Sequence, residues 1–101
     1  MAMKVLAARY VPSGPNINVR VQVHLDTTRL LPDAVTPDPA WCYERTWQVP
    51  GQQPGETAPQ LTARIQSWMA ATKPEVKAEC QSVLAALTVA TGTLSIEGQA
   101  L

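Results

Sequence analysis

The 101-residue chain has little charge and no excess of either sign. Its eight basic and eight acidic residues balance, and charged residues make up 16% of the sequence, below the ~25% usual in soluble domains. A nucleic-acid-binding protein normally carries a basic excess, so the balance argues against that class, and against electrostatic binding to a membrane. Copies without net charge do not repel one another, which favours association. The low-charge exterior suits a surface covered by partners, although a genome rich in G and C produces the same bias.

The chain also lacks long apolar runs. None approaches the ~18 residues of a membrane span. The short run near the N-terminus ends at Arg9, below the ~7–15 residues of a secretory signal core. We therefore expect neither a membrane partner nor a secretory leader.

Metal ligands and phosphate-binding loops are equally scarce. The two cysteines, Cys42 and Cys80, form no CxxC pair, and the sequence contains one histidine, which is too few ligands for a typical zinc site. Gly51 and Gly55 lack the following Lys-Ser/Thr of a phosphate-binding loop. The sequence predicts no cofactor, no metal site and no disulfide between the two cysteines.

No catalytic residue is predicted either. His24 and Asp26 are two residues apart, a spacing that could orient an imidazole on one strand face, but no activated serine or cysteine is marked beside them. A hydrogen-bonded or solvated histidine is the simpler interpretation. A Cys42–His24 nucleophile pair stays open as the enzymatic alternative, because such partners can be distant in sequence.

What the sequence does contain is a strand pattern over residues 17–26. One set of alternating positions is apolar and the other is polar, as expected for a strand with one buried and one wet face. The apolar set is Ile17, Val19, Val21, Val23 and Leu25. Such a strand belongs to an antiparallel sheet covered on one side.

Three further segments supply partner strands. Residues 4–11 are apolar on both faces and are joined to 17–26 by a five-residue turn, which predicts a hairpin. Residues 41–49 alternate as a third strand. Residues 93–97 alternate as a short fourth strand, with Leu94 and Ile96 expected to point inward.

Two helix-start signals follow the third strand. Thr57 and Gln60 form a capping box with Pro59 between them. The Thr72–Glu75 segment repeats this pattern, with Pro74 in the place of Pro59. We therefore favour two short helices, with one long helix kinked at Pro74 as the alternative. The predicted fold is a single α+β domain over residues 1–101: a small, mostly antiparallel sheet in the order strand-strand-arm-strand-helix-helix-strand, with two short helices on one face.

The arm comprises residues 27–40, with sequence TTRLLPDAVTPDPA. It is longer than most connections, and its three prolines disfavour helix. It is a loop over its own sheet edge, an arm on a neighbouring subunit, or a mobile linker. Its apolar side chains, which a solvated linker would not need, are the predicted interface: Leu30, Leu31 and Val35, with Trp41 as an anchor where the arm rejoins the sheet.

The segment Tyr43-Glu44-Arg45-Thr46-Trp47-Gln48-Val49-Pro50, leading into an alanine-rich helical part, resembles small structural proteins of tailed bacteriophages. This resemblance implies a non-enzymatic capsid, neck or tail protein that acts through subunit contacts in a symmetric ring or lattice. Its location would be the virion, assembled in the host cytoplasm, and its partners copies of itself and other virion proteins. No family site motif matches, so no site residue is carried over. The alternative is a small soluble regulatory or inhibitor domain that binds one host protein.

Overall fold

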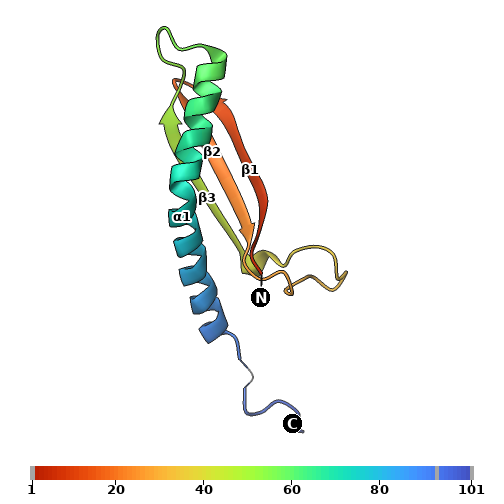
Figure 1. The fold of residues 1–101 in the computed structure, drawn as a ribbon. Coiled ribbons are helices and arrows are strands. Elements are labelled where there is room, and N and C mark those ends of the chain that lie inside the picture. Colours follow the sequence, from red (N-terminus) through yellow and green to blue (C-terminus); the bar gives the residue numbers. More distant parts are fainter. Residues whose placement is uncertain (1, 93, 101) are drawn as a thin grey trace.

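A three-stranded antiparallel sheet carries one long helix on one face (Figure 1). The computed structural model describes residues 2–92 and 94–100. In chain order the elements are β1 (Lys4–Ser13), β2 (Asn16–His24), the 3-10 turn η1 (Pro39–Trp41), β3 (Cys42–Pro50) and α1 (Ala58–Ala90). The prediction of an α+β fold with an antiparallel sheet is confirmed.

The central strand is β2, which pairs with β1 on one side and β3 on the other. All five alternating apolar residues from Ile17 to Leu25 are buried. The predicted dry face is therefore confirmed. Because β2 lies between two strands, both edges of the sheet, β1 and β3, present unpaired backbone groups.

The β1 strand departs from simple alternation. Its register against β2 shifts between Val5 and Ala7, and such a bulge moves later side chains to the opposite face. Val5 therefore shares the helix side with Ala8, whereas Ala7 lies on the polar side near Arg20. Simple period-2 alternation would place Val5 and Ala7 on one face, but the bulge puts them on opposite faces.

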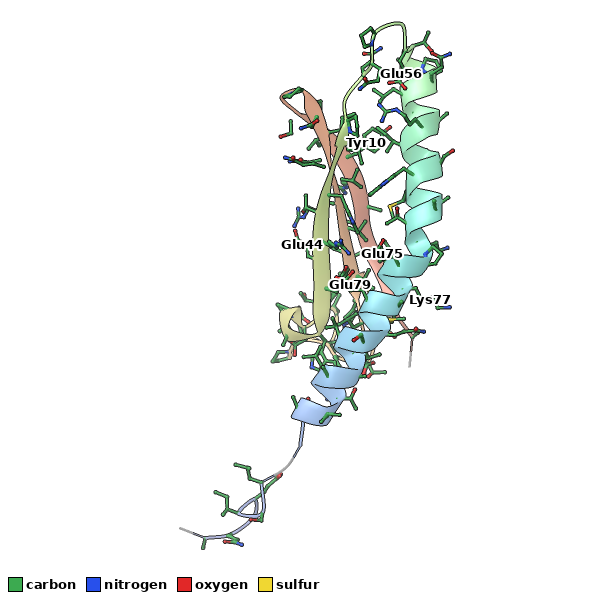
Figure 2. The ribbon with its side chains drawn as sticks, turned by 90° about the vertical axis from the view of Figure 1, so that its left-hand side faces the viewer. Tyr10, Glu44, Glu56, Glu75, Lys77 and Glu79 are labelled. Carbon is green, nitrogen blue, oxygen red and sulfur yellow. The ribbon has the colours of Figure 1, made fainter. Side chains whose placement is uncertain are left out.

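The prediction of two helices is also wrong: α1 is a single 33-residue helix with Pro74 in its interior. Proline cannot donate to the Ala70 carbonyl four residues earlier, at a cost of about 3 kcal/mol. Both residues are on the exposed side of α1, where water can bind that carbonyl. Thr72, expected as the second N-cap, is instead buried in the helix. The axis changes direction near its middle (Figure 2).

The helix continues through Pro74 because its apolar stripe packs on the sheet at both ends. One buried cluster joins Ile17, Val19, Val49 and Ile65, and a second joins Val21, Val23, Leu25, Tyr43, Val76 and Cys80. Burial of such side chains contributes about 1.5–3 kcal/mol each, which offsets the cost of the proline. The first capping box is present as predicted, with Gln60 N–H bonded to the Thr57 hydroxyl.

The predicted fourth strand is absent from the described residues. Residues 95–98 form a turn, with the Glu97 N–H bonded to the Leu94 carbonyl. Leu94 and Ile96 are exposed rather than inward; residue 93 lies outside the described residues. Alternation over five residues is a weak signal, since only tertiary packing can hold so short a strand.

The molecule is elongated, with a longest extent of 72 Å and a radius of gyration of 18.7 Å. A compact domain of this length would have a radius of about 13 Å. The difference arises because a 33-residue helix is about 50 Å long, whereas the nine residues of β2 span about 30 Å. Residues 94–100 continue beyond the end of α1 and lengthen the molecule further (Figure 1). An elongated shape leaves much apolar surface uncovered.

Candidate functional site

The arm between β2 and β3 forms an ordered, projecting loop. Leu30 and Pro37 make an isolated antiparallel bridge, and the Leu31 N–H donates to the Thr36 carbonyl at 2.8 Å. We call residues 30–37 the finger. Figure 1 shows it extending from the end of the sheet, past the β1 edge and away from α1.

The structure places the predicted interface residues in two environments. Leu30, Leu31 and Val35 lie in the finger and are exposed, Val35 by 79%. Trp41 is only 7% exposed, and the Arg29 guanidinium stacks over its ring at 4.5 Å. Trp41 thus anchors the arm to its own sheet, whereas the other three side chains remain accessible to a neighbour.

Polar contacts fix the base of the arm. His24 Nε2–H donates to the Arg29 carbonyl at 2.8 Å. The Asp26 carboxylate accepts from the Thr28 hydroxyl at 2.6 Å and from the Thr28 N–H at 2.9 Å. These bonds from Thr28 hold the pKa of the Asp26 carboxyl below its usual value, with a smaller contribution from the charge of Arg29. The finger therefore projects from a fixed support.

The two candidate catalytic residues, His24 and Cys42, hydrogen-bond to backbone carbonyls rather than to each other. His24 and Cys42 are register partners on β2 and β3, but the Cys42 thiol donates to the Asp38 carbonyl. Burial, and then the charge of Asp38, raises the pKa of the Cys42 thiol, which disfavours the nucleophilic thiolate. His24, expected on the wet face, is buried under the arm. This geometry gives the histidine a structural role at the arm's base.

Arginine side chains bridge α1 and the rest of the molecule along β3; we call this boundary between α1 and the sheet the β3 seam, and the boundary along β1 the β1 seam. The Arg45 guanidinium bonds to Glu79 at 2.5 Å and to Glu75 at 3.2 Å. Its planar group also lies over the Trp47 ring at 4.8 Å. Farther along, Arg64 bonds to the Glu56 carboxylate and to two backbone carbonyls. In Figure 2, Glu75 and Glu79 point from α1 toward the sheet.

The opposite seam, along β1, is open and apolar. Two adjoining hollows of about 230 Å³ and about 290 Å³ lie between β1 and α1. We call them together the β1 groove. Its apolar walls include Met3, Val5, Val21, Val23, Met69 and Val76. Lys73 and Lys77 line it from the helix, and Figure 2 shows Lys77 pointing away from the Glu75 side.

Sequence reasoning missed the β1 surface. Val5 and Val11 are each 56% exposed, and Leu6 and Tyr10 are also exposed. The signal was present, since residues 4–11 are apolar on both faces, but that pattern alone does not distinguish an exposed edge strand from a buried one. An edge strand with apolar side chains on both faces is instead a surface suited to another chain.

Two classes of site find no support in the described part of the chain. No three His, Cys, Asp or Glu side chains there come together as a metal site. No helix in residues 2–92 or 94–100 is both long and apolar enough to cross a bilayer.

Comparison with protein-family models, with curated proteins and with solved structures gave no match. The candidate site is therefore defined by geometry alone: an exposed apolar finger that projects from the end of the sheet (Figure 1) and an open apolar groove between β1 and α1.

Proposed function

We propose that this protein is a non-enzymatic assembly subunit that works through contacts between its own copies. The observation that carries the proposal is the exposed apolar surface of the edge strand β1. Val5 and Val11, on opposite faces of that strand, are each 56% exposed. A long edge strand of this composition is a template for another chain, because it offers both unpaired backbone groups and apolar area.

The setting of a tailed-bacteriophage virion, in the capsid, neck or tail, belongs to the same proposal. It rests on the resemblance of the Tyr43–Pro50 segment to small phage structural proteins. Small subunits with little net charge can be placed side by side in a ring or lattice without mutual repulsion. Other virion proteins would then be the remaining partners, with no catalytic step required.

The first test is the mass of the chain in solution over a wide concentration range, measured by sedimentation equilibrium. We expect species larger than the monomer that grow with concentration. A chain that stays monomeric throughout contradicts self-assembly. A defined 1:1 complex with a foreign protein would instead support the regulatory or inhibitor alternative.

The matched test uses one added charge on each edge strand. Val11→Lys places a lysine on the exposed β1 edge, and charged residues are a common natural block to edge-to-edge pairing. Thr46→Lys places the same charge at an exposed position of β3. We expect Val11→Lys to lower the average mass and Thr46→Lys to leave it closer to that of the parent. Equal effects would remove β1 from the proposed interface.

A further inference from the structure

The finger is rigid enough to act as a docking element. The Asp33 carboxylate accepts from the N–H groups of Val35 and Thr36 at 2.9 and 2.8 Å and from the Thr36 hydroxyl. Ala34 has φ 59°, a left-handed conformation that non-glycine residues seldom adopt, so these bonds hold a specific turn. A preformed loop loses little conformational entropy when it binds.

The finger offers apolar side chains around one negative charge. Leu30, Leu31 and Val35 are exposed, and Asp33 is the only charged residue in 30–37. The hydrogen bond from the Thr36 hydroxyl, followed by those from the backbone, holds the pKa of the Asp33 carboxyl below its usual value. Asp33 therefore carries its charge at neutral pH.

The β1 groove has the complementary character. Its walls are apolar, and its helix side carries Lys73 and Lys77. Among the ion pairs of the described residues, neither lysine takes part, whereas Glu75 and Glu79 are paired with Arg45 on the other seam. The groove thus combines apolar surface with two positive charges that lack an acidic partner within the described chain.

The finger cannot reach the groove of its own copy. Its base lies against the polar face of the sheet, where Pro37 and Pro39 border a hollow with Gln22 and Glu44. The groove lies between β1 and α1, and α1 covers the opposite face of the sheet (Figure 2). The buried Trp41 and its backbone bond to the Leu25 N–H fix the base in that position. An occupant of the groove with the finger's chemistry must come from a second molecule.

We propose that the finger of one copy docks into the β1 groove of the next, with Leu31 and Val35 on its apolar walls and Asp33 near Lys73 and Lys77. This inference rests on the proposed function and specifies the two surfaces that meet. The contact is heterologous, because finger and groove are different parts of the molecule. Repetition of such a contact yields a closed ring or an open filament rather than a two-fold dimer.

The test is a disulfide between two differently tagged copies. One copy carries Val35→Cys and the other Lys73→Cys, both with Cys42→Ser, since serine can keep the bond to the Asp38 carbonyl; Cys80 is buried and stays. The control replaces Lys73→Cys with Ala71→Cys. Ala71 is exposed and lies roughly 160° around the helix from Lys73.

Mixed under mild oxidation, the Val35→Cys and Lys73→Cys copies should give a crosslinked pair carrying both tags, and the Ala71→Cys pair should give much less. In the parent, Val35→Asp should weaken association on the order of tenfold or more, because it removes apolar burial and adds charge repulsion to Asp33. A third arm uses Leu94→Cys in place of Val35→Cys, since Leu94 is also an exposed apolar side chain near the C-terminus.

The outcomes separate the two proposals. Equal crosslinking to Lys73→Cys and Ala71→Cys, while the parent still forms larger species, overturns finger-in-groove docking and leaves self-assembly standing. Preferential crosslinking of Leu94→Cys assigns the groove to the C-terminal segment and also overturns the docking. A parent that is monomeric at every concentration overturns the proposed function and this inference with it.

Discussion

The two seams between α1 and the sheet differ in how they are closed. Along β3, Arg45 and Arg64 link strand, loop and helix through carboxylates and backbone carbonyls. Along β1, valine and methionine side chains face an open groove. Both seams are formed by the same helix on the same sheet, so the presence of the helix does not by itself explain why one is closed and the other open. The distinction lies in which residues each edge strand carries and in where α1 crosses the sheet.

If the chain self-assembles as proposed, this difference assigns stability to the β3 seam and association to the β1 seam. The β3 seam is closed by the ion pairs of Arg45 and Arg64, although the buried Tyr43 hydroxyl has no hydrogen-bond partner among the described residues. The β1 seam leaves apolar area in water, which is unfavourable for an isolated subunit and favourable for an assembled one. The following predictions test this division, beginning with the largest expected effect.

The core beneath the helix should dominate stability. Ile65→Ala removes a side chain that is 2% exposed and should lower the free energy of unfolding by about 2–5 kcal/mol. The matched change on the open seam, Val5→Ala, should alter the stability of the dilute monomer by about 0.5 kcal/mol or less. Urea denaturation of both variants measures the difference, and similar costs would contradict an open β1 seam.

The ion pairs of Arg45 on the β3 seam should make a smaller contribution that depends on salt. Arg45→Ala removes both ion pairs to α1 and the stacking on Trp47, so the thermal midpoint should fall. High salt should reduce this loss, because part of it is screened electrostatic attraction. A double-mutant cycle with Glu79→Gln measures the coupling energy between Arg45 and Glu79. Additive effects of the two substitutions would show that this pair does not couple strand and helix.

The base of the arm should be more sensitive to acid than an uncharged position at its tip, such as Val35. Because the pKa of Asp26 is lowered by its bonds from Thr28, its contribution to folding is present above the unfolded value of about 3.9. That contribution is lost as the pH falls through the lower folded value. Asp26→Asn should therefore be less stable than the parent at neutral pH, with the gap closing in acid.

The matched tip variant is Val35→Ser, which changes an exposed side chain and should leave monomer stability nearly unchanged at every pH. Thermal unfolding from neutral pH down to the acid range gives both curves. A gap for Asp26→Asn that widens as the pH falls would reverse the sign and contradict the assigned hydrogen bonds.

The smallest effect on stability should come from the lysines of the groove. Lys73→Ala together with Lys77→Ala should change the unfolding free energy of the monomer by about 0.5 kcal/mol or less, since both are surface positions. The same variant should associate more weakly than the parent in sedimentation. A large loss of stability with unchanged association would place these lysines in the fold rather than in an interface.

The sequence predicted the central strand well because its alternation is long and faultless. Ile17 to Leu25 form the dry face, and the Thr57–Gln60 capping box begins the helix as expected. These features depend on local chemistry and on a single buried face. Local signals of that length are seldom overridden by tertiary packing.

The errors have particular causes. Thr72–Glu75 carries a complete helix-start signal, but Thr72 is needed in the core, and Pro74 falls on the solvent side of the helix, where its missing N–H is tolerated. The bulge near Leu6 shifted the faces of β1 without any glycine or proline to mark it. In both cases packing between distant segments decided the outcome, and a local pattern cannot encode that choice.

The candidate site was only partly predictable. Leu30, Leu31 and Val35 could be selected because a solvated loop has no need of them, and the structure leaves them exposed. The β1 groove could not be found from sequence, since its walls come from β1, β2 and α1. Its existence depends on where the helix crosses the sheet.

Amide hydrogen exchange, compared between dilute and concentrated protein, tests the division of the two seams most directly. If copies meet through β1 and the finger, slower exchange at high concentration should appear in Lys4–Ser13 and in residues 30–37, while Cys42–Pro50 stays unchanged. Added protection in β3 alone, or a larger mass without added protection in β1 and the finger, would contradict the account.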